Sequence, residues 1–174
     1  MPTSDYLINL ENRRQVILER FKAGEARQFQ SLLRDIAKDI RARLQEGDLT
    51  EFNRRRQIAL LADVNELLTA GLGKATGQLK NNLLASAVDE AEFSSEALNK
   101  VISGFDSVLP TPDQIRAAVL SAPLSVRGPN GGKLLEPWIK DWSKFQITQV
   151  DGAIRRGFFE GQTNQQMINS VVGS

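Results

Sequence analysis

The distribution of proline constrains this chain more than any other feature of its sequence. After Pro2 no proline occurs until Pro110, so nothing in that stretch removes a backbone donor or forces a break in a helix. Apolar residues in the same stretch recur at steps of three and four, which is the spacing of one helix face. The pattern predicts long α-helices over the first two-thirds of the chain.

The first predicted helix begins at a cap supplied by Thr3, Ser4 or Asp5 and ends at Gly47, because glycine is the usual residue just past a helix C-terminus. From Phe29 onward its apolar residues are spaced by four, three, four and four, which makes a narrow stripe. The apolar positions of this helix include Leu7, Leu10, Ile17, Phe21, Phe29, Leu33, Ile36, Ile40 and Leu44.

A second long helix is predicted directly after the first. The segment Asp48–Glu51 has the form of a capping box, in which the Asp48 and Glu51 side chains satisfy free backbone amides. Two helices of about 40 residues, each roughly 60 Å long, joined by so short a turn are expected to lie antiparallel as a long hairpin. The side chains expected to be buried in the second helix are Leu49, Phe52, Leu60, Val64, Leu67, Leu72, Leu79 and Leu83.

A hairpin of this length leaves part of its apolar stripes uncovered, so it needs a third element or a second subunit. The segment Glu90–Val108 is the predicted third helix, with Phe93, Leu98 and Phe105 among its apolar residues. The expected first domain is therefore a helical hairpin plus a third helix, spanning residues 1–108.

The residue composition changes at Leu109–Pro112, where prolines reappear in the sequence. Thr111 caps a short helix with Pro112 at its first position, and this helix is predicted to run to about Ser121. The Pro- and Gly-rich segment 122–135 predicts a short β-hairpin or an ordered loop. We therefore predict a mainly α protein with a smaller second domain over residues 109–174, and we expect the natural chain to continue beyond Ser174.

Two further helices are predicted in this second domain. One opens at Glu136 and runs to about Glu160. Gly161 breaks it, and Thr163 caps a last helix over Asn164–Val172. Three aromatic side chains share one face of the longer helix and are interpreted as core rather than as a platform for stacking bases, namely Trp138, Trp142 and Phe145.

The residues that are missing restrict the chemistry. The chain has no His and no Cys, which excludes the usual zinc sites, a cysteine nucleophile, a Ser-His-Asp triad and disulfides. The net charge of +1 gives no overall attraction toward nucleic acid or an anionic membrane. The sequence pattern predicts neither a membrane-spanning helix nor a secretion signal. We expect no enzyme activity, no cofactor, no metal and no small-molecule substrate.

Two motifs need separate interpretation. The segment Gly71–Gly77 resembles a phosphate loop, but Ala75 follows Lys74 where the Walker pattern requires Ser or Thr; a kink, a hinge or close helix packing is the better interpretation. The cluster Arg54, Arg55 and Arg56 is a candidate set of phosphate contacts. Three consecutive helical residues fan out over about 200°, so a solvated surface is the interpretation that we favour.

One stretch has an unusual pattern as a whole. Gly132, Leu135 and Trp138 follow a G-x-x-L-x-x-W pattern. The helix after them carries Ile154, Arg155, Gly157 and Gly161, followed by Thr163 and Ile168. This arrangement resembles the head-morphogenesis and minor head proteins of tailed bacteriophages, the F-protein family of Mu-type phages. The segment 16–25 is also similar to the start of podovirus internal head proteins.

This resemblance implies a structural protein of the virion, near the portal, that acts in head assembly or genome ejection. The implied partners are the portal or other head proteins and further copies of the chain in a ring or bundle. Packaged DNA is a further candidate partner, and the resemblance does not decide whether the chain contacts the membrane during ejection. The implied location is the head interior or head–tail junction, after synthesis in the host cytoplasm. The alternative is a packaging adaptor that binds nucleic acid through Arg54–Arg56 and Arg155–Arg156.

Overall fold

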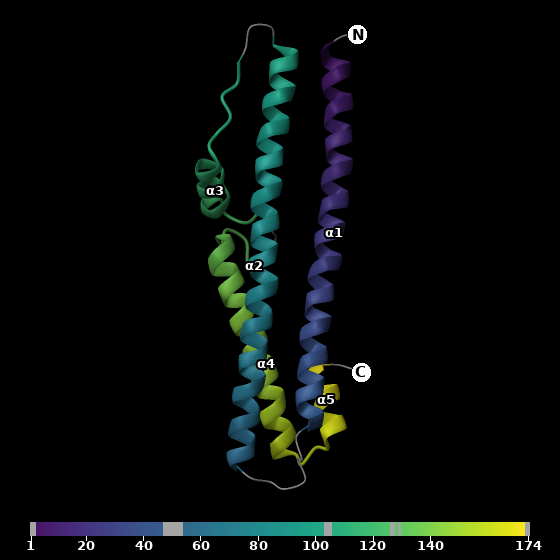
Figure 1. The fold of residues 1–174 in the computed structure, drawn as a ribbon, viewed down its shortest axis with the longest axis vertical. Helices are drawn as coiled ribbons and strands as arrows, with labels where there is room; N and C mark the ends of the chain where they lie inside the picture. Colours follow the sequence, from purple (N-terminus) through teal and green to yellow (C-terminus); the bar gives the residue numbers. More distant parts are fainter. Residues whose placement is uncertain (1–2, 47–53, 103–105, 126–127, 129, 173–174) are drawn as a thin grey trace. The chain divides into compact units, whose positions relative to one another are not determined.

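The computed structural model describes residues 3–46, 54–102, 106–125, 128 and 130–172. Most of them are helical and no strand occurs among them, which confirms the mainly α class. Figure 1 shows the helices as coiled ribbons coloured along the chain. They are α1 (Thr3–Glu46), α2 (Arg54–Val101), α3 (Pro112–Ser121), α4 (Leu135–Phe159) and α5 (Asn164–Val172).

The chain forms two compact units that each combine segments distant in the sequence. The first unit contains Met1–Phe29 and Gln78–Glu136, and the second contains Gln30–Gly77 and Pro137–Ser174. Each unit combines two segments that are distant in the sequence. The predicted domains are instead continuous, 1–108 and 109–174, so the units do not test the boundary between them. That boundary stays a prediction.

The second unit has an apolar core made by four helical segments. The stripe predicted on the first helix is confirmed from Ile36 onward, because Ile40 and Leu44 are 3% and 0% exposed. Ile36 of α1 lies against Gly71 of α2, and the Arg43 Nε donates to Asp63 Oδ2 at 2.9 Å. Because the α2 position falls as the α1 position rises, the two helices run antiparallel within this unit. The core consists of Ile36, Ile40, Leu44, Leu60, Leu61, Val64, Leu68, Leu72, Ile154, Phe158, Met167 and Ile168.

Polar contacts join α1 and α2 in the first unit. Arg14 donates to Glu90 Oε2 at 2.7 Å and lies 4.9 Å from the centroid of the Phe93 ring. About three turns further along α1, the Asn82 amide donates to both carboxylate oxygens of Glu25 at 2.9 Å. This order of pairs makes the two helices antiparallel in this unit as well.

The segment after α2 is tied back onto that helix. The Ser107 backbone N–H donates to Asn99 Oδ1 at 2.9 Å, and the Ser107 hydroxyl donates to the Ser95 carbonyl at 3.3 Å. The following helix begins as predicted: Thr111 and Gln114 form a capping box and Pro112 occupies the first helical turn. Local sequence therefore determines where α3 starts, and Ile115 anchors it with 9% exposure.

The predicted third helix over Glu90–Val108 is wrong. The part Glu90–Val101 belongs to α2, which runs without interruption from Arg54. The physical reason is the lack of any proline or glycine between Gly77 and Val101, so nothing in the sequence ends the helix.

The glycine-rich part of α2 is neither a phosphate loop nor a break in the helix. A Cβ added to Gly71 would lie 2.5 Å from Ile36 Cγ1. A Cβ added to Gly73 or Gly77 would meet no atom within 4 Å. Close helix packing, one of the three predicted explanations, therefore applies at Gly71.

Three further predictions need correction. No strand occurs in the described part of segment 122–135, although the Leu124 N–H donates to the Lys133 carbonyl at 2.8 Å, so the ordered-loop alternative fits better than the β-hairpin. Phe145 is 57% exposed and does not join the core beside Trp142. Ile17 is 52% exposed, because the buried side of α1 at this level is formed by other positions.

Gly47, the Asp48–Glu51 capping box, Leu49 and Phe52 lie outside the described residues, and these predictions stay open. Among the helices that the structure describes, none combines the length and the apolar character that a bilayer span requires.

Candidate interaction surfaces

The motif residues of the C-terminal part form the corner between α4 and α5, which we call the α4–α5 corner (residues 154–168). Gly161 has a φ of 65°, a left-handed conformation that side chains with a Cβ rarely adopt. The Thr163 hydroxyl accepts from the Gln166 N–H at 3.3 Å, and the Gln166 side chain accepts from the Thr163 N–H at 2.8 Å. Two motif positions thus end one helix and start the next.

The same motif packs the two helices together. Ile154 and Ile168 are 0% and 1% exposed in the core of the second unit. A Cβ on Gly157 would lie 2.9 Å from Met167 Cε, so the glycine admits the methionine side chain of α5. Each buried motif residue therefore has a structural task within this chain.

The remaining motif residues lie at the surface or half-buried. Trp138 stacks on Trp142 with ring centroids 6.4 Å apart. Arg155 is exposed, and its Nε donates to Asp151 Oδ2 at 2.6 Å along α4. This hydrogen bond, together with the charge of Asp151, raises the pKa of Arg155. The pair holds Arg155 along its own helix.

The candidate phosphate contacts Arg54, Arg55 and Arg56 are the first residues of α2 and all three are exposed. They occupy the first turn of the helix, where the macrodipole disfavours positive charge. Their side chains are exposed to solvent, as the sequence interpretation favoured.

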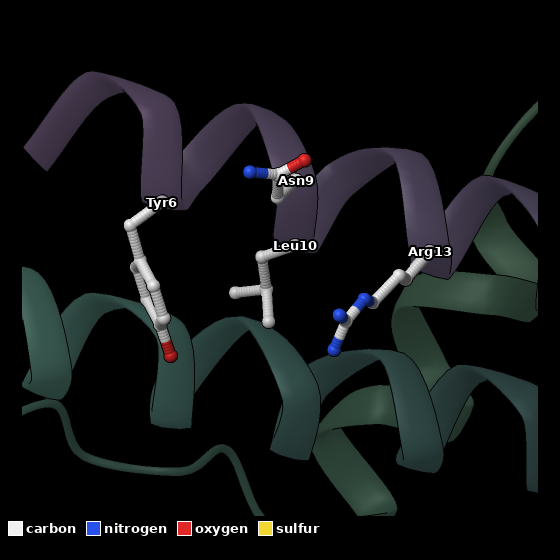
Figure 2. Close-up of a pocket in the computed structure, with 4 residues that line it drawn as sticks. All are labelled: Tyr6, Asn9, Leu10 and Arg13. Carbon is white, nitrogen blue, oxygen red and sulfur yellow. The ribbon is translucent and has the colours of Figure 1, made fainter. Parts of the chain in front are cut away.

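Sequence reasoning missed a surface on α1 in the first unit. A cavity of about 290 Å³ is lined by Tyr6, Asn9, Leu10 and Arg13; in Figure 2 the tyrosine, leucine and arginine project from α1 toward α2. A second, open hollow of about 480 Å³ is lined by Asn9, Asn12, Arg13, Val16, Ile17 and Arg20.

The two hollows share Asn9 and Arg13, and their polar lining consists of arginines, asparagines and one tyrosine. These groups can donate hydrogen bonds, and no carboxylate is among the described residues that line the two hollows. Such a lining can bind an anion. Among the described residues no group of acidic side chains is arranged to hold a metal ion.

One further ionisable pair is notable in the first unit. Lys80 of α2 donates to the Glu136 carboxylate at the start of α4. This hydrogen bond and the lysine charge lower the pKa of Glu136 below its ordinary value of 4.5. The pair attaches the first turn of α4 to α2.

Comparison with known proteins returned no match: no family model, no curated protein and no solved structure is similar to this chain at a significant level.

Proposed function

We propose that this protein is a structural component of a tailed-phage virion, a minor head or internal protein near the portal that acts in head assembly or genome ejection. The observation that carries the proposal is the α4–α5 corner, where the motif residues Ile154, Gly157, Gly161, Thr163 and Ile168 act as a packing unit. A motif that specifies packing suits a protein whose task is to hold others in place.

The proposal includes a long antiparallel hairpin of α1 and α2. It is supported within each unit by the order of two contacts between these helices. They are Arg14–Glu90 and Glu25–Asn82 in the first unit, and Ile36–Gly71 and Arg43–Asp63 in the second. Several large apolar side chains are exposed along the helices. Copies of the chain in a ring or bundle would cover them, and the portal or other head proteins are the proposed partners.

The test is the composition of purified virions and of the isolated protein. Quantitative mass spectrometry of particles should detect the chain at a fixed copy number per portal, and mass photometry should show closed oligomers of the isolated protein. Its absence from particles that package DNA normally would refute the virion role.

The alternative is a packaging adaptor that binds nucleic acid through Arg54–Arg56. The exposure of all three arginines supports it, but their place in the first helical turn does not. The discriminating measurement is whether replacing these three residues by Gln reduces the salt dependence of DNA binding.

A further inference from the structure

A regular spacing of arginines distinguishes α1 from the other helices. Arg13, Arg20 and Arg27 follow one another at intervals of seven residues in the first unit, and the interval continues at Arg34 and Arg41 in the second. Seven residues rise about 10.5 Å and turn about 20° short of two full turns. Arg13, Arg20 and Arg27, which we call the arginine row, therefore lie along one side of α1 over roughly 21 Å.

The charges of the arginine row are uncompensated. All three residues are exposed, and none makes an ion pair or a hydrogen bond with another residue that the structure describes. On a helix, a carboxylate three or four residues away is the nearest partner for an arginine. Those positions hold Asn9, Leu10, Val16, Ile17, Ala23, Gly24, Gln30 and Ser31, with no acidic residue among them.

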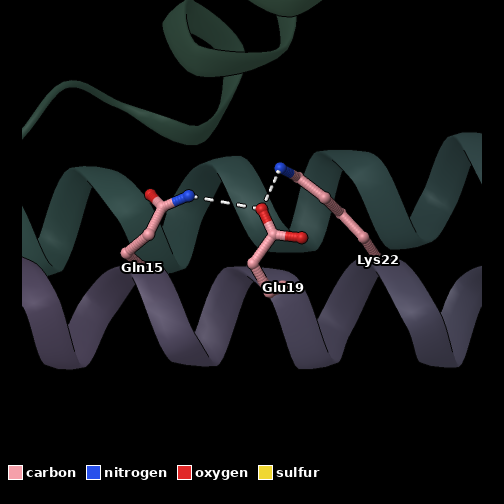
Figure 3. Close-up of polar contacts among 3 residues, drawn as sticks. All are labelled: Gln15, Glu19 and Lys22. Carbon is pink, nitrogen blue, oxygen red and sulfur yellow. Dashed lines mark hydrogen bonds and ion pairs between the residues drawn. The ribbon is translucent and has the colours of Figure 1, made fainter.

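The other basic residues of this part of α1 contrast with the row. Arg14, the immediate neighbour of Arg13, pairs with Glu90 of α2. Figure 3 shows that Glu19, next to Arg20 in the sequence, accepts hydrogen bonds from Gln15 at 3.2 Å and Lys22 at 2.8 Å. The acidic residue next to Arg20 in the sequence is thus engaged by Gln15 and Lys22.

The surface around the row is shaped to receive a ligand with several anionic groups. Arg13 and Arg20 border the open hollow, in which Asn9 and Asn12 add amide donors. Beyond it Gly24 lies between Arg20 and Arg27, and a Cβ at this glycine would meet no atom within 4 Å. Packing within the chain does not require glycine there, whereas a bare helix surface lets a strand of phosphates approach closely.

We propose that the arginine row binds the phosphate backbone of a nucleic acid. A guanidinium donates two parallel hydrogen bonds to a phosphate, and duplex DNA carries one charge per about 1.7 Å of its axis. The row therefore spans about 12 duplex charges over its roughly 21 Å. At this density each arginine can reach a phosphate even though the arginine spacing does not match the phosphate spacing. Contacts of this kind position a nucleic acid without reading its sequence.

The residues beside the row favour a nucleic acid over an anionic membrane. A helix that lies on a membrane has a continuous apolar face next to its basic residues. Of the positions three and four residues from Arg20, Val16 and Ile17 carry large apolar side chains, whereas Ala23 and Gly24 are small. This site differs from Arg54–Arg56, and it does not depend on the proposed virion role.

The test compares the native chain with the triple variant R13Q/R20Q/R27Q. Fluorescence anisotropy measures binding to a labelled duplex of about 24 base pairs and to its single strand, between about 50 and 200 mM salt. Losing three phosphate contacts should reduce the slope of log K against log salt by about 2.7 for a duplex or about 2.1 for a single strand. The form of nucleic acid whose titration shows this change is the form that the row contacts.

The matched control is K74Q/K100Q/K140Q, which removes the same charge at three exposed positions outside the row. It should keep the native slope, and R13K/R20K/R27K should keep most of the binding because the charges remain. Circular dichroism should show native helicity for all variants.

Three results would overturn the proposal. The first is that the native chain does not bind measurably at low salt. The second is that the control loses as much slope as the row variant, which would mean that net charge alone causes the effect. The third is a row variant that binds nucleic acid normally but no longer binds phosphatidylserine vesicles, which would assign the face to a membrane.

Discussion

At the scale of single residues, glycines in one helix serve different purposes. Gly71 and Gly73 are two residues apart in α2, yet only Gly71 faces another helix closely, at Ile36. A side chain at Gly71 would overlap the isoleucine, whereas a side chain at Gly73 would point into open space. The stability effect of the same substitution should therefore change sign between the two positions.

We predict that Gly71→Ala lowers the free energy of unfolding by about 1 to 2 kcal/mol, because overpacking of about 1–3 kcal/mol exceeds the gain in helix propensity. Gly73→Ala is the matched control and should raise stability by up to about 1 kcal/mol. Chemical denaturation of both variants measures the difference. Equal stabilisation by both substitutions would mean that Ile36 moves aside without cost.

The ion pair between Lys80 and Glu136 predicts a pH dependence. Because the folded-state pKa of Glu136 is below its ordinary value of 4.5, the pair stabilises the fold fully above that pH and loses its effect as the pH falls through the folded-state pKa. The difference in melting temperature between the native chain and Glu136→Gln should thus be constant above pH 4.5 and shrink below it. A difference that grew on acidification would contradict the pairing.

At the scale of elements, the caps decide where helices begin and end. Thr163 starts α5 through reciprocal bonds with Gln166, as Thr111 does for α3 with Gln114. A threonine inside a helix does not stabilise it in this way. The Thr69 hydroxyl of α2 donates to the Asn65 carbonyl of the same helix at 2.7 Å, and threonine has a lower helix propensity than alanine.

We therefore predict opposite results for the same substitution in two places. Thr163→Ala should lower the free energy of unfolding by about 1 kcal/mol, because it leaves backbone amides of α5 without an acceptor. Thr69→Ala should leave it unchanged or raise it by up to about 0.7 kcal/mol. Thermal unfolding followed by circular dichroism tests the pair, and a stabilising Thr163→Ala would show that the cap does not hold α5.

At the scale of the whole molecule, the question is which apolar side chains serve folding and which serve assembly. Ile40 is 3% exposed in the core of the second unit, whereas Phe145 and Phe159 are 57% and 91% exposed on α4. The two phenylalanines are fourteen residues apart, which places them on the same side of the helix. We expect the isoleucine to be needed for folding and the phenylalanines for contact between chains.

The prediction is that Ile40→Asp abolishes cooperative folding, because a buried charge without a partner costs several kcal/mol. Phe145→Ser/Phe159→Ser should keep the native helicity and lower the oligomer mass. Circular dichroism and mass photometry on the same samples separate the two effects. A double variant that assembles normally would place the contact between copies on another surface.

Sequence patterns determined the helical class and several helix ends by themselves. The start of α3 at Thr111–Pro112, the break at Gly161 and the start of α5 at Thr163 were predictable, because capping depends on residues within one turn of each other. The buried stripe from Ile36 to Leu44 was predictable for the same reason, since its period belongs to one helix.

Only the tertiary structure decided which faces of these helices are covered. It showed that Arg14 pairs with Glu90 and that Phe145 stays exposed. It also separated Arg14 from the unpaired arginine row, although all these arginines look alike in the sequence. Burial and pairing depend on neighbours brought in from distant segments, as Glu90 is brought to Arg14, and a periodic pattern within one helix carries no information about those neighbours.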